Sequence, residues 1–196
     1  MAILDLGCGH GALLYALQKA GYHNAYGVDN SPEQLAVAQE LGVEGVVEDD
    51  VMGFLTKTPN AILDVVVAFD LVEHFTKTEL VHLVDEIWRV CKPDGKLILH
   101  TPNAEGPFAG RMRYWDFTHE LAFTSTSLGQ LLRASGFRTV TYWEDKPVVH
   151  GFKSLVRAGL WSLIRAGLLF YIAVETGVFD RHAVFSQNLL AIAIKA

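Results

Sequence analysis

The sequence predicts an α/β fold built on a doubly wound, mostly parallel sheet. Over residues 1–101, short β-rich runs alternate with segments of helical periodicity, which is the pattern of βαβ units. Residues 62–69 form a nearly unbroken apolar run, as expected for a strand that helices cover on both faces. The chain has 196 residues, of which 51% are hydrophobic, so we expect one domain with a large core.

Local signals place the elements of the first half. Gly21 closes the first helix and Gly42 the second, which starts with the N-cap Ser31, Pro32 at the first helical position and Gln34 completing a capping box. The expected order is strand 3–6, helix 12–20, strand 25–28, a helix between residues 31 and 42, strand 43–47, strand 62–69, helix 78–91, a turn at 92–95 and strand 96–101.

The second half begins with an irregular stretch at residues 102–123 that is rich in aromatic residues and arginine. Loops of this kind are where α/β proteins build substrate pockets. Regular structure is then expected as helix 126–135, strand 137–143, helix 152–174 and strand 188–195.

Composition narrows the class of partner. The formal net charge of −6 argues against a dedicated nucleic-acid binder, so small molecules are the better partner class. Cys8 and Cys91 show neither metal-site spacing nor a disulfide framework, which suits a reducing cytoplasm. No basic leader and no uninterrupted run of about 18 apolar residues occurs, so we expect a soluble, cytoplasmic protein.

The most informative motif is the glycine-rich turn after the first strand. Gly7, Gly9 and Gly11 let the backbone turn sharply and let a nucleotide-like ligand lie against the main chain. Asp5 stands just before them, where its carboxylate would repel a pyrophosphate. We therefore expect a ligand that carries positive charge.

Acidic residues follow the predicted parallel strands, whose carboxyl ends meet at one edge of the sheet. Asp29 is spaced from the glycines to accept hydrogen bonds from both ribose hydroxyls. Asp50 could accept from an exocyclic adenine amine, while Asp5 and Glu73 would surround an ammonium and a sulfonium. The acids expected in this crevice are Asp5, Asp29, Asp49, Asp50, Asp70 and Glu73.

Together these motifs resemble the class I S-adenosylmethionine-dependent methyltransferases. The resemblance runs through LDLGCGHG, YGVDNS, VVEDDVMGFL, FDLVEHF, CKPDGKLILHTPN and SQNLLAIAIK. The Glu-His pair after strand four and the Thr-Pro-Asn end of strand five are most similar to ubiquinone-type O-methyltransferases and glycan-cluster methyltransferases. The resemblance implies a Rossmann-like, seven-stranded sheet with an antiparallel last strand.

The resemblance also implies a cofactor, S-adenosylmethionine, with S-adenosylhomocysteine as product. The glycine turn would pass under its methionine part and Asp29 would take the ribose. Asp50 and Val51 would hold the adenine, and the backbone near Phe69 and Asp70 would approach the ammonium. The full set of expected cofactor residues is Asp5, Gly7, Cys8, Gly9, Gly11, Asp29, Asn30, Asp49, Asp50, Val51, Phe69, Asp70 and Glu73.

Under this reading the chain is one methyltransferase domain, residues 1–196. It comprises a cofactor-binding half at 1–101, an acceptor loop at 102–123 and a C-terminal half at 124–196 with the inserted helix 152–174. Members of the family normally carry one or two cover helices before strand one, and here Met1 abuts that strand. Either the sequence is shortened, or the acceptor loop and helix 152–174 supply the cover.

Two histidines are candidates for catalysis. His119 lies in the loop expected over the transferred methyl, with Asp116 spaced to orient its imidazole, so it is the better acceptor-side base. A purely structural His119 that pins the loop fits the sequence equally well. His74 follows a strand end, where it could also cap a helix or pack beneath the cofactor. His100, inside an apolar strand, reads as a core residue.

The acceptor loop also carries the expected substrate residues Arg111, Arg113, Tyr114 and Trp115. The planar guanidinium groups could pair with an acidic acceptor, although a surface role fits as well. Asp116 with His119 gives only two potential metal ligands, so we predict no metal.

Residues 152–174 form a helix with basic residues on one side and apolar surface elsewhere. It could lie on a membrane interface near a lipid-linked acceptor, or it could cover the core or form a homodimer contact.

The predicted reaction is in-line methyl transfer, with oxygen as the preferred atom of a small-molecule, glycan-linked or lipid-linked acceptor. Two alternatives stay open. Gly7, Gly9 and Ala12 with Asp29 also fit an NAD-dependent dehydrogenase, and a relative that binds S-adenosylmethionine without turnover would share every motif.

Overall fold

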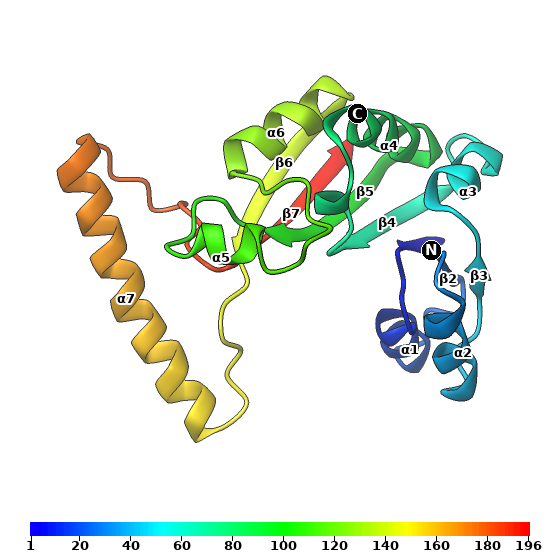
Figure 1. Cartoon of the computed structure of the whole chain (residues 1–196), viewed down its shortest axis with the longest axis horizontal. Coiled ribbons are helices and arrows are strands. Elements are labelled where there is room, and N and C mark those ends of the chain that lie inside the picture. The colour runs from blue at the N-terminus through cyan, green and yellow to red at the C-terminus, as the bar shows by residue number, and fades with distance from the viewer.

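A seven-stranded sheet forms the centre of the computed structural model, which describes residues 1–196 (Figure 1). Its strands are β1 (Ile3–Leu6), β2 (Ala25–Asp29), β3 (Val46–Glu48), β4 (Leu63–Phe69), β5 (Cys91–Pro102), β6 (Phe137–Glu144) and β7 (Asn188–Lys195). Their order is β3-β2-β1-β4-β5-β7-β6. The first five strands run parallel, whereas β7 is antiparallel to both β5 and β6, so the predicted sheet is confirmed.

Helices cover both faces of the sheet. They are α1 (Ala12–Lys19), α2 (Pro32–Glu40), α3 (Val51–Lys57), α4 (Lys77–Val90), α5 (Ala109–Arg113), α6 (Ser125–Ala134) and α7 (Phe152–Thr176), with a short 3-10 helix, η1, at Val72–His74. Leu55, Leu83 and Leu128 bring α3, α4 and α6 into one core cluster, and Leu14 and Leu35 bring α1 and α2 into the other. The doubly wound arrangement leaves the carboxyl ends of β1 and β4, where the strand order reverses, open to a ligand.

Three local predictions differ from the structure. The predicted strand 43–47 starts late, because the amide of Val43 still donates to the Ala38 carbonyl at the end of α2. The turn at 92–95 lies within β5 as a bulge between the Cys91 and Lys96 pairs. Only half of the capping box at Ser31 forms: the Ser31 hydroxyl accepts from the Gln34 amide at 3.4 Å, but the Ser31 amide donates to Asp29 Oδ1 at 2.9 Å instead of to the Gln34 side chain.

Helix α7 stands apart from the sheet and the other helices (Figure 1). It joins β6 to β7, which form the edge of the sheet farthest from β3 and β2. The expectation that this helix helps to cover the cofactor is therefore wrong. Sequence spacing located the helix, but the strand order decided which edge of the sheet carries it.

Candidate functional site

The glycine turn connects β1 to α1 in the conformation that the sequence predicts. Gly7, Gly9 and Gly11 have φ values of 68°, 52° and 75°, in the left-handed region that favours glycine. The amides of Gly7 and Cys8 both donate to the Val28 carbonyl of β2, at 2.9 and 3.1 Å. The turn is thus fastened to the neighbouring strand, with its main chain at the carboxyl end of the sheet.

Asp29 is the organising side chain of this turn. Its Oδ2 accepts from the Gly9 amide at 2.8 Å, and its Oδ1 accepts from the Ser31 amide at 2.9 Å. Each carboxylate oxygen keeps lone-pair capacity for a ligand hydroxyl. The carboxylate that would take the ribose therefore also holds the glycine turn in place.

Asp5 lies beneath the same turn and is only 4% exposed. Burial, and secondarily the nearby Asp29 carboxylate, raises the pKa of Asp5 to about 7. Cys8 is buried close to both carboxylates, and burial first, with these charges second, raises the pKa of its thiol to about 12. The thiol stays neutral, whereas Asp5 is poised to ionise near neutral pH.

The raised pKa of Asp5 makes stability depend on pH. Between its ordinary value of 3.8 and about 7, the folded state holds a proton that the unfolded chain has lost, so the free energy of unfolding falls as pH rises through this window. We expect Asp5→Asn to flatten the dependence and to raise stability at pH 8 by roughly 2–4 kcal/mol. Urea unfolding of both proteins at pH 5 and pH 8 checks this. Parallel pH profiles would contradict it.

The predicted adenine residues lie at the start of α3. Asp50 is exposed and caps the helix by accepting from the Gly53 amide at 2.8 Å, and Val51 is buried as the first helical residue. Asp49 is turned toward Lys57, which donates to it at 2.7 Å, and this bond lowers the pKa of Asp49. Asn30 is exposed at the end of β2. The Asp49 carboxylate is thus already paired with Lys57, whereas the exposed Asp50 carboxylate remains accessible to a ligand.

At the end of β4, Asp70 adopts a positive φ of 49° and contacts His100 of β5 at 2.8 Å. His100 Nε2 lies 3.6 Å from Asp145, and the His100 ring packs 5.6 Å from that of Phe69. Burial lowers the pKa of His100, but Asp70 and then Asp145 outweigh it and leave the pKa above its ordinary value. The His100 side chain is only 18% exposed, and Asp70 after β4 and Asp145 after β6 supply polar partners for its ring, which agrees with the expected core role.

Glu73, His74 and His119 form a second cluster, which joins the end of β4 to the acceptor loop. Glu73 is 1% exposed and accepts from Thr101 Oγ1 at 3.1 Å; burial raises the pKa of its carboxyl. The two imidazole rings meet edge to face with their centres 4.8 Å apart. The structure therefore places Glu73 with the histidines, apart from the Asp5 and Asp29 pair, from Asp70 beside His100, and from Asp49 and Asp50 at the start of α3.

The orienting role predicted for Asp116 is wrong. Its Oδ1 accepts from the amide and the hydroxyl of Thr118, at 2.8 and 2.7 Å, and the Thr118 hydroxyl contacts His74 Nδ1 at 2.8 Å. His119 Nδ1 instead contacts the Met112 carbonyl at 3.2 Å. Asp116 thus orients His74 through Thr118, a link that linear spacing could not show.

These groups could also hold a metal ion, which the sequence did not predict. One ligand atom from each of Glu73, His74 and His119 lies within 4.8 Å of the others. Two imidazoles and a carboxylate suit a divalent transition metal such as zinc. The sequence missed this set because His119 lies more than 40 residues from Glu73 and His74, and only the fold brings the three side chains together.

The four predicted substrate residues differ in whether their side chains are already engaged within the protein. Arg113 donates to the main-chain carbonyls of His119 and Glu120, so it holds the loop together. Arg111 packs over the Trp115 ring, and Tyr114 and Trp115 are 78% and 70% exposed. Arg111 and the two aromatic rings remain free for a partner, whereas Arg113 does not.

A cavity of about 490 Å³ lies between the acceptor loop and α7. Phe108 of the loop, Trp161 and Arg157 of α7, and Asp145 line it. Asp145 also contacts His100, which pairs with Asp70 at the cofactor end of β4. Polar contacts therefore connect this cavity to the predicted cofactor site.

The model of a methyltransferase-domain family matches residues 1–142. The chain belongs to this family, and its cofactor is S-adenosylmethionine. With this membership and the antiparallel β7, the dehydrogenase alternative is excluded. A relative that binds the cofactor without turnover remains an alternative.

Relatives of this methyltransferase domain act on different acceptors. This chain is 30% identical over 152 residues to the tRNA U34 carboxymethyltransferase of Hydrogenovibrio crunogenus. The match covers 70% of this chain and 45% of that protein. The chain is 31% identical over 106 residues to the ubiquinone biosynthesis O-methyltransferase of Xylella fastidiosa, covering 52% and 42%. The chain thus spans less than half the length of these relatives.

Among solved structures, a SAM-dependent methyltransferase from Archaeoglobus fulgidus superposes with a TM-score of 0.75 at 22% identity. The match covers 99% of this chain and 86% of that one. The methyltransferase fold predicted from the glycine turn and strand pattern is confirmed.

Proposed function

We propose that this domain transfers the methyl group of S-adenosylmethionine to a hydroxyl oxygen of a small-molecule, glycan-linked or lipid-linked acceptor. The observation that carries the proposal is the cluster of Glu73, His74 and His119, which offers proton acceptors at the junction of β4 and the acceptor loop. One relative, the ubiquinone biosynthesis O-methyltransferase of Xylella fastidiosa, is an O-methyltransferase by name, which supports oxygen as the acceptor atom. The net charge of −6 disfavours an RNA acceptor.

The chemistry requires no redox step. The acceptor oxygen attacks the methyl carbon, the new C–O bond forms as the C–S bond breaks, and the electron pair stays on the sulfur of S-adenosylhomocysteine. His119 takes the hydroxyl proton, and Asp116 with Thr118 steadies the neighbouring His74. Because the methyl donor is already activated, most of the acceleration comes from holding donor and acceptor in line.

The experiment is transfer of radiolabelled methyl from S-adenosylmethionine into aqueous and lipid extracts of cells, followed by mass spectrometry of the labelled product. A methyl ether or ester supports the proposal. A methylamine or a carbon-methylated product would overturn the oxygen assignment, and labelled RNA would overturn the proposed class of acceptor. Cofactor binding in calorimetry without any labelled product would favour the non-catalytic relative.

A second candidate mechanism is metal-assisted O-methylation, favoured by the same three side chains. A divalent ion held by Glu73, His74 and His119 would lower the pKa of the acceptor hydroxyl and reduce the need for a base. If it operates, dialysis against EDTA should lower turnover about tenfold or more and added Zn²⁺ or Mn²⁺ should restore it. Unchanged turnover in EDTA would leave His119 as the base.

A further inference from the structure

The outward side of α7 is more apolar than the side that faces the domain. The residues on it lie three, four or seven positions apart, as one helical face requires. They are all at least 45% exposed, and they are Phe152, Val156, Leu160, Leu163, Phe170 and Val174. No charged residue interrupts this outward stripe, which spans about 33 Å of helix at 1.5 Å per residue. A soluble helix normally shows the opposite pattern, with its apolar face inward.

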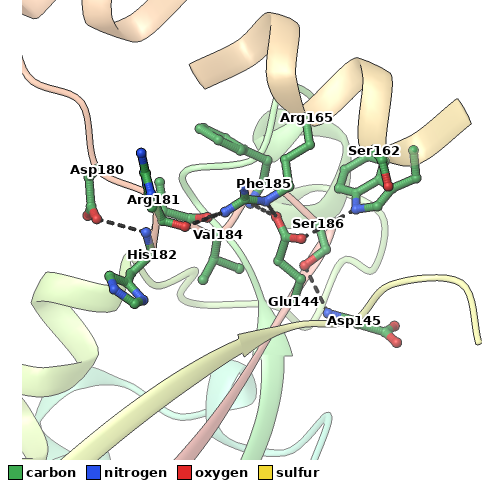
Figure 2. A network of polar contacts seen from close by, with 12 residues as sticks. Glu144, Asp145, Ser162, Arg165, Asp180, Arg181, His182, Val184, Phe185 and Ser186 are labelled. Atoms are coloured by element: carbon green, nitrogen blue, oxygen red, sulfur yellow. Dashed lines mark hydrogen bonds and ion pairs between the residues drawn. The ribbon is translucent and has the colours of Figure 1, made fainter. Parts of the chain in front are cut away.

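Polar contacts on the inner side fix the orientation of this stripe. Figure 2 shows Arg165 of α7 reaching Glu144 at the end of β6, with Nε and Oε1 3.1 Å apart. Arg165 also donates to the carbonyls of Arg181 and Ala183, and Trp161 donates to Glu144. These contacts hold the polar side of α7 toward the domain, so the apolar stripe faces away from it.

The helix has the length and hydropathy of a membrane span but not the connections of one. The helix has 25 residues, and an 18-residue window within it reaches a mean hydropathy of 1.4 with 6% of that window buried. A single crossing would leave the two ends of α7 on opposite sides of a hydrocarbon core about 30 Å thick. Both ends, however, return to β6 and β7, which are paired in one sheet. The helix can therefore lie on a bilayer but cannot cross it.

Charge indicates which kind of surface it meets. Residues 146–182 carry five lysines and arginines against one glutamate and one aspartate, in a chain whose formal net charge is −6. Lys153 and Arg157 flank the apolar stripe, and both residues are exposed. An apolar stripe bordered by cations is the pattern of interfacial helices that bind anionic lipid.

We infer that α7 docks the domain on an anionic lipid bilayer, with the stripe buried at the level of the headgroups. The cavity lined by Arg157 and Trp161 then lies on the inner side of the docked helix, between α7 and the rest of the domain. The exposed rings of Tyr114, Trp115 and Phe117 in the acceptor loop suit the same interface. This inference concerns where the protein binds and does not require turnover.

Co-sedimentation with vesicles tests the inference. The full chain should bind vesicles of equimolar phosphatidylglycerol and phosphatidylcholine, and bind phosphatidylcholine alone weakly. Leu163→Glu with Phe170→Glu should lower the partition coefficient about tenfold or more, because two large apolar side chains leave the interface. Lys153→Glu with Arg157→Glu should weaken binding to the anionic vesicles only.

The matched control is Val37→Glu with Val81→Glu, which adds the same charges at exposed apolar positions on α2 and α4. It should bind vesicles like the unmodified chain. S-adenosylmethionine affinity and the circular dichroism spectrum should be unchanged in every variant, so folding and cofactor binding are monitored separately from vesicle binding. Equal vesicle binding by all variants would overturn the inference. A dimer that the Leu163 and Phe170 changes dissociate, without vesicle binding, would show instead that a second copy covers the stripe.

Discussion

Replacing Asp29 with alanine is expected to raise the dissociation constant for S-adenosylmethionine by about 100-fold or more. The ribose hydroxyls lose their charged acceptor, and charge-assisted hydrogen bonds are worth about 1.5–3 kcal/mol each. The Gly9 and Ser31 amides also lose the carboxylate that holds the glycine turn. The effect should therefore exceed the loss of ligand contacts alone. Isothermal titration calorimetry measures it.

Two variants make this prediction specific. Asp29→Asn keeps one oxygen acceptor, so it should recover part of the affinity. Asp85→Ala removes an exposed carboxylate from α4, far from the glycine turn in sequence, and should bind the cofactor normally. An affinity in Asp29→Ala equal to that of the unmodified chain would refute the ribose assignment.

His119→Ala is expected to lower turnover by about 10²- to 10⁴-fold, the usual contribution of a general base. Cofactor affinity should stay the same, because His119 lies on the acceptor side, with His74 and Glu73. The loop should also persist, since Arg113 binds the main-chain carbonyls of residues 119 and 120, which alanine retains. Single-turnover transfer of labelled methyl separates the chemical step from binding.

A readout beyond activity distinguishes a base from a structural residue. Added imidazole should partly restore turnover in His119→Ala if the lost group accepts the proton, and it should do nothing if the ring only pins the loop. His82→Ala, an exposed histidine on α4, is the matched control and should retain full turnover. Full turnover in His119→Ala would remove this residue from the mechanism.

The sequence predicted the strands, the longer helices and the glycine turn, because each depends on local signals. Periodicity of 2.0 or 3.6 residues, caps such as Ser31 and left-handed glycines such as Gly7 act over a few neighbouring residues. The short helices α3 and α5 were not predicted, since a few residues give too little periodicity to detect. The late start of β3 was not predicted either, because the Val43 amide still donates to the end of α2.

By itself the sequence determined the family and the cofactor half, in which Gly7 and Asp29 belong to consecutive βα units. Only the tertiary structure decided which side chains meet on the acceptor side and how α7 is oriented. There His100 meets Asp70 and Asp145, His119 meets His74 and Glu73, and α7 turns its apolar stripe outward. The physical reason is range: backbone turns and caps act between near neighbours, whereas side-chain clusters form where strand order and loop path bring distant residues together.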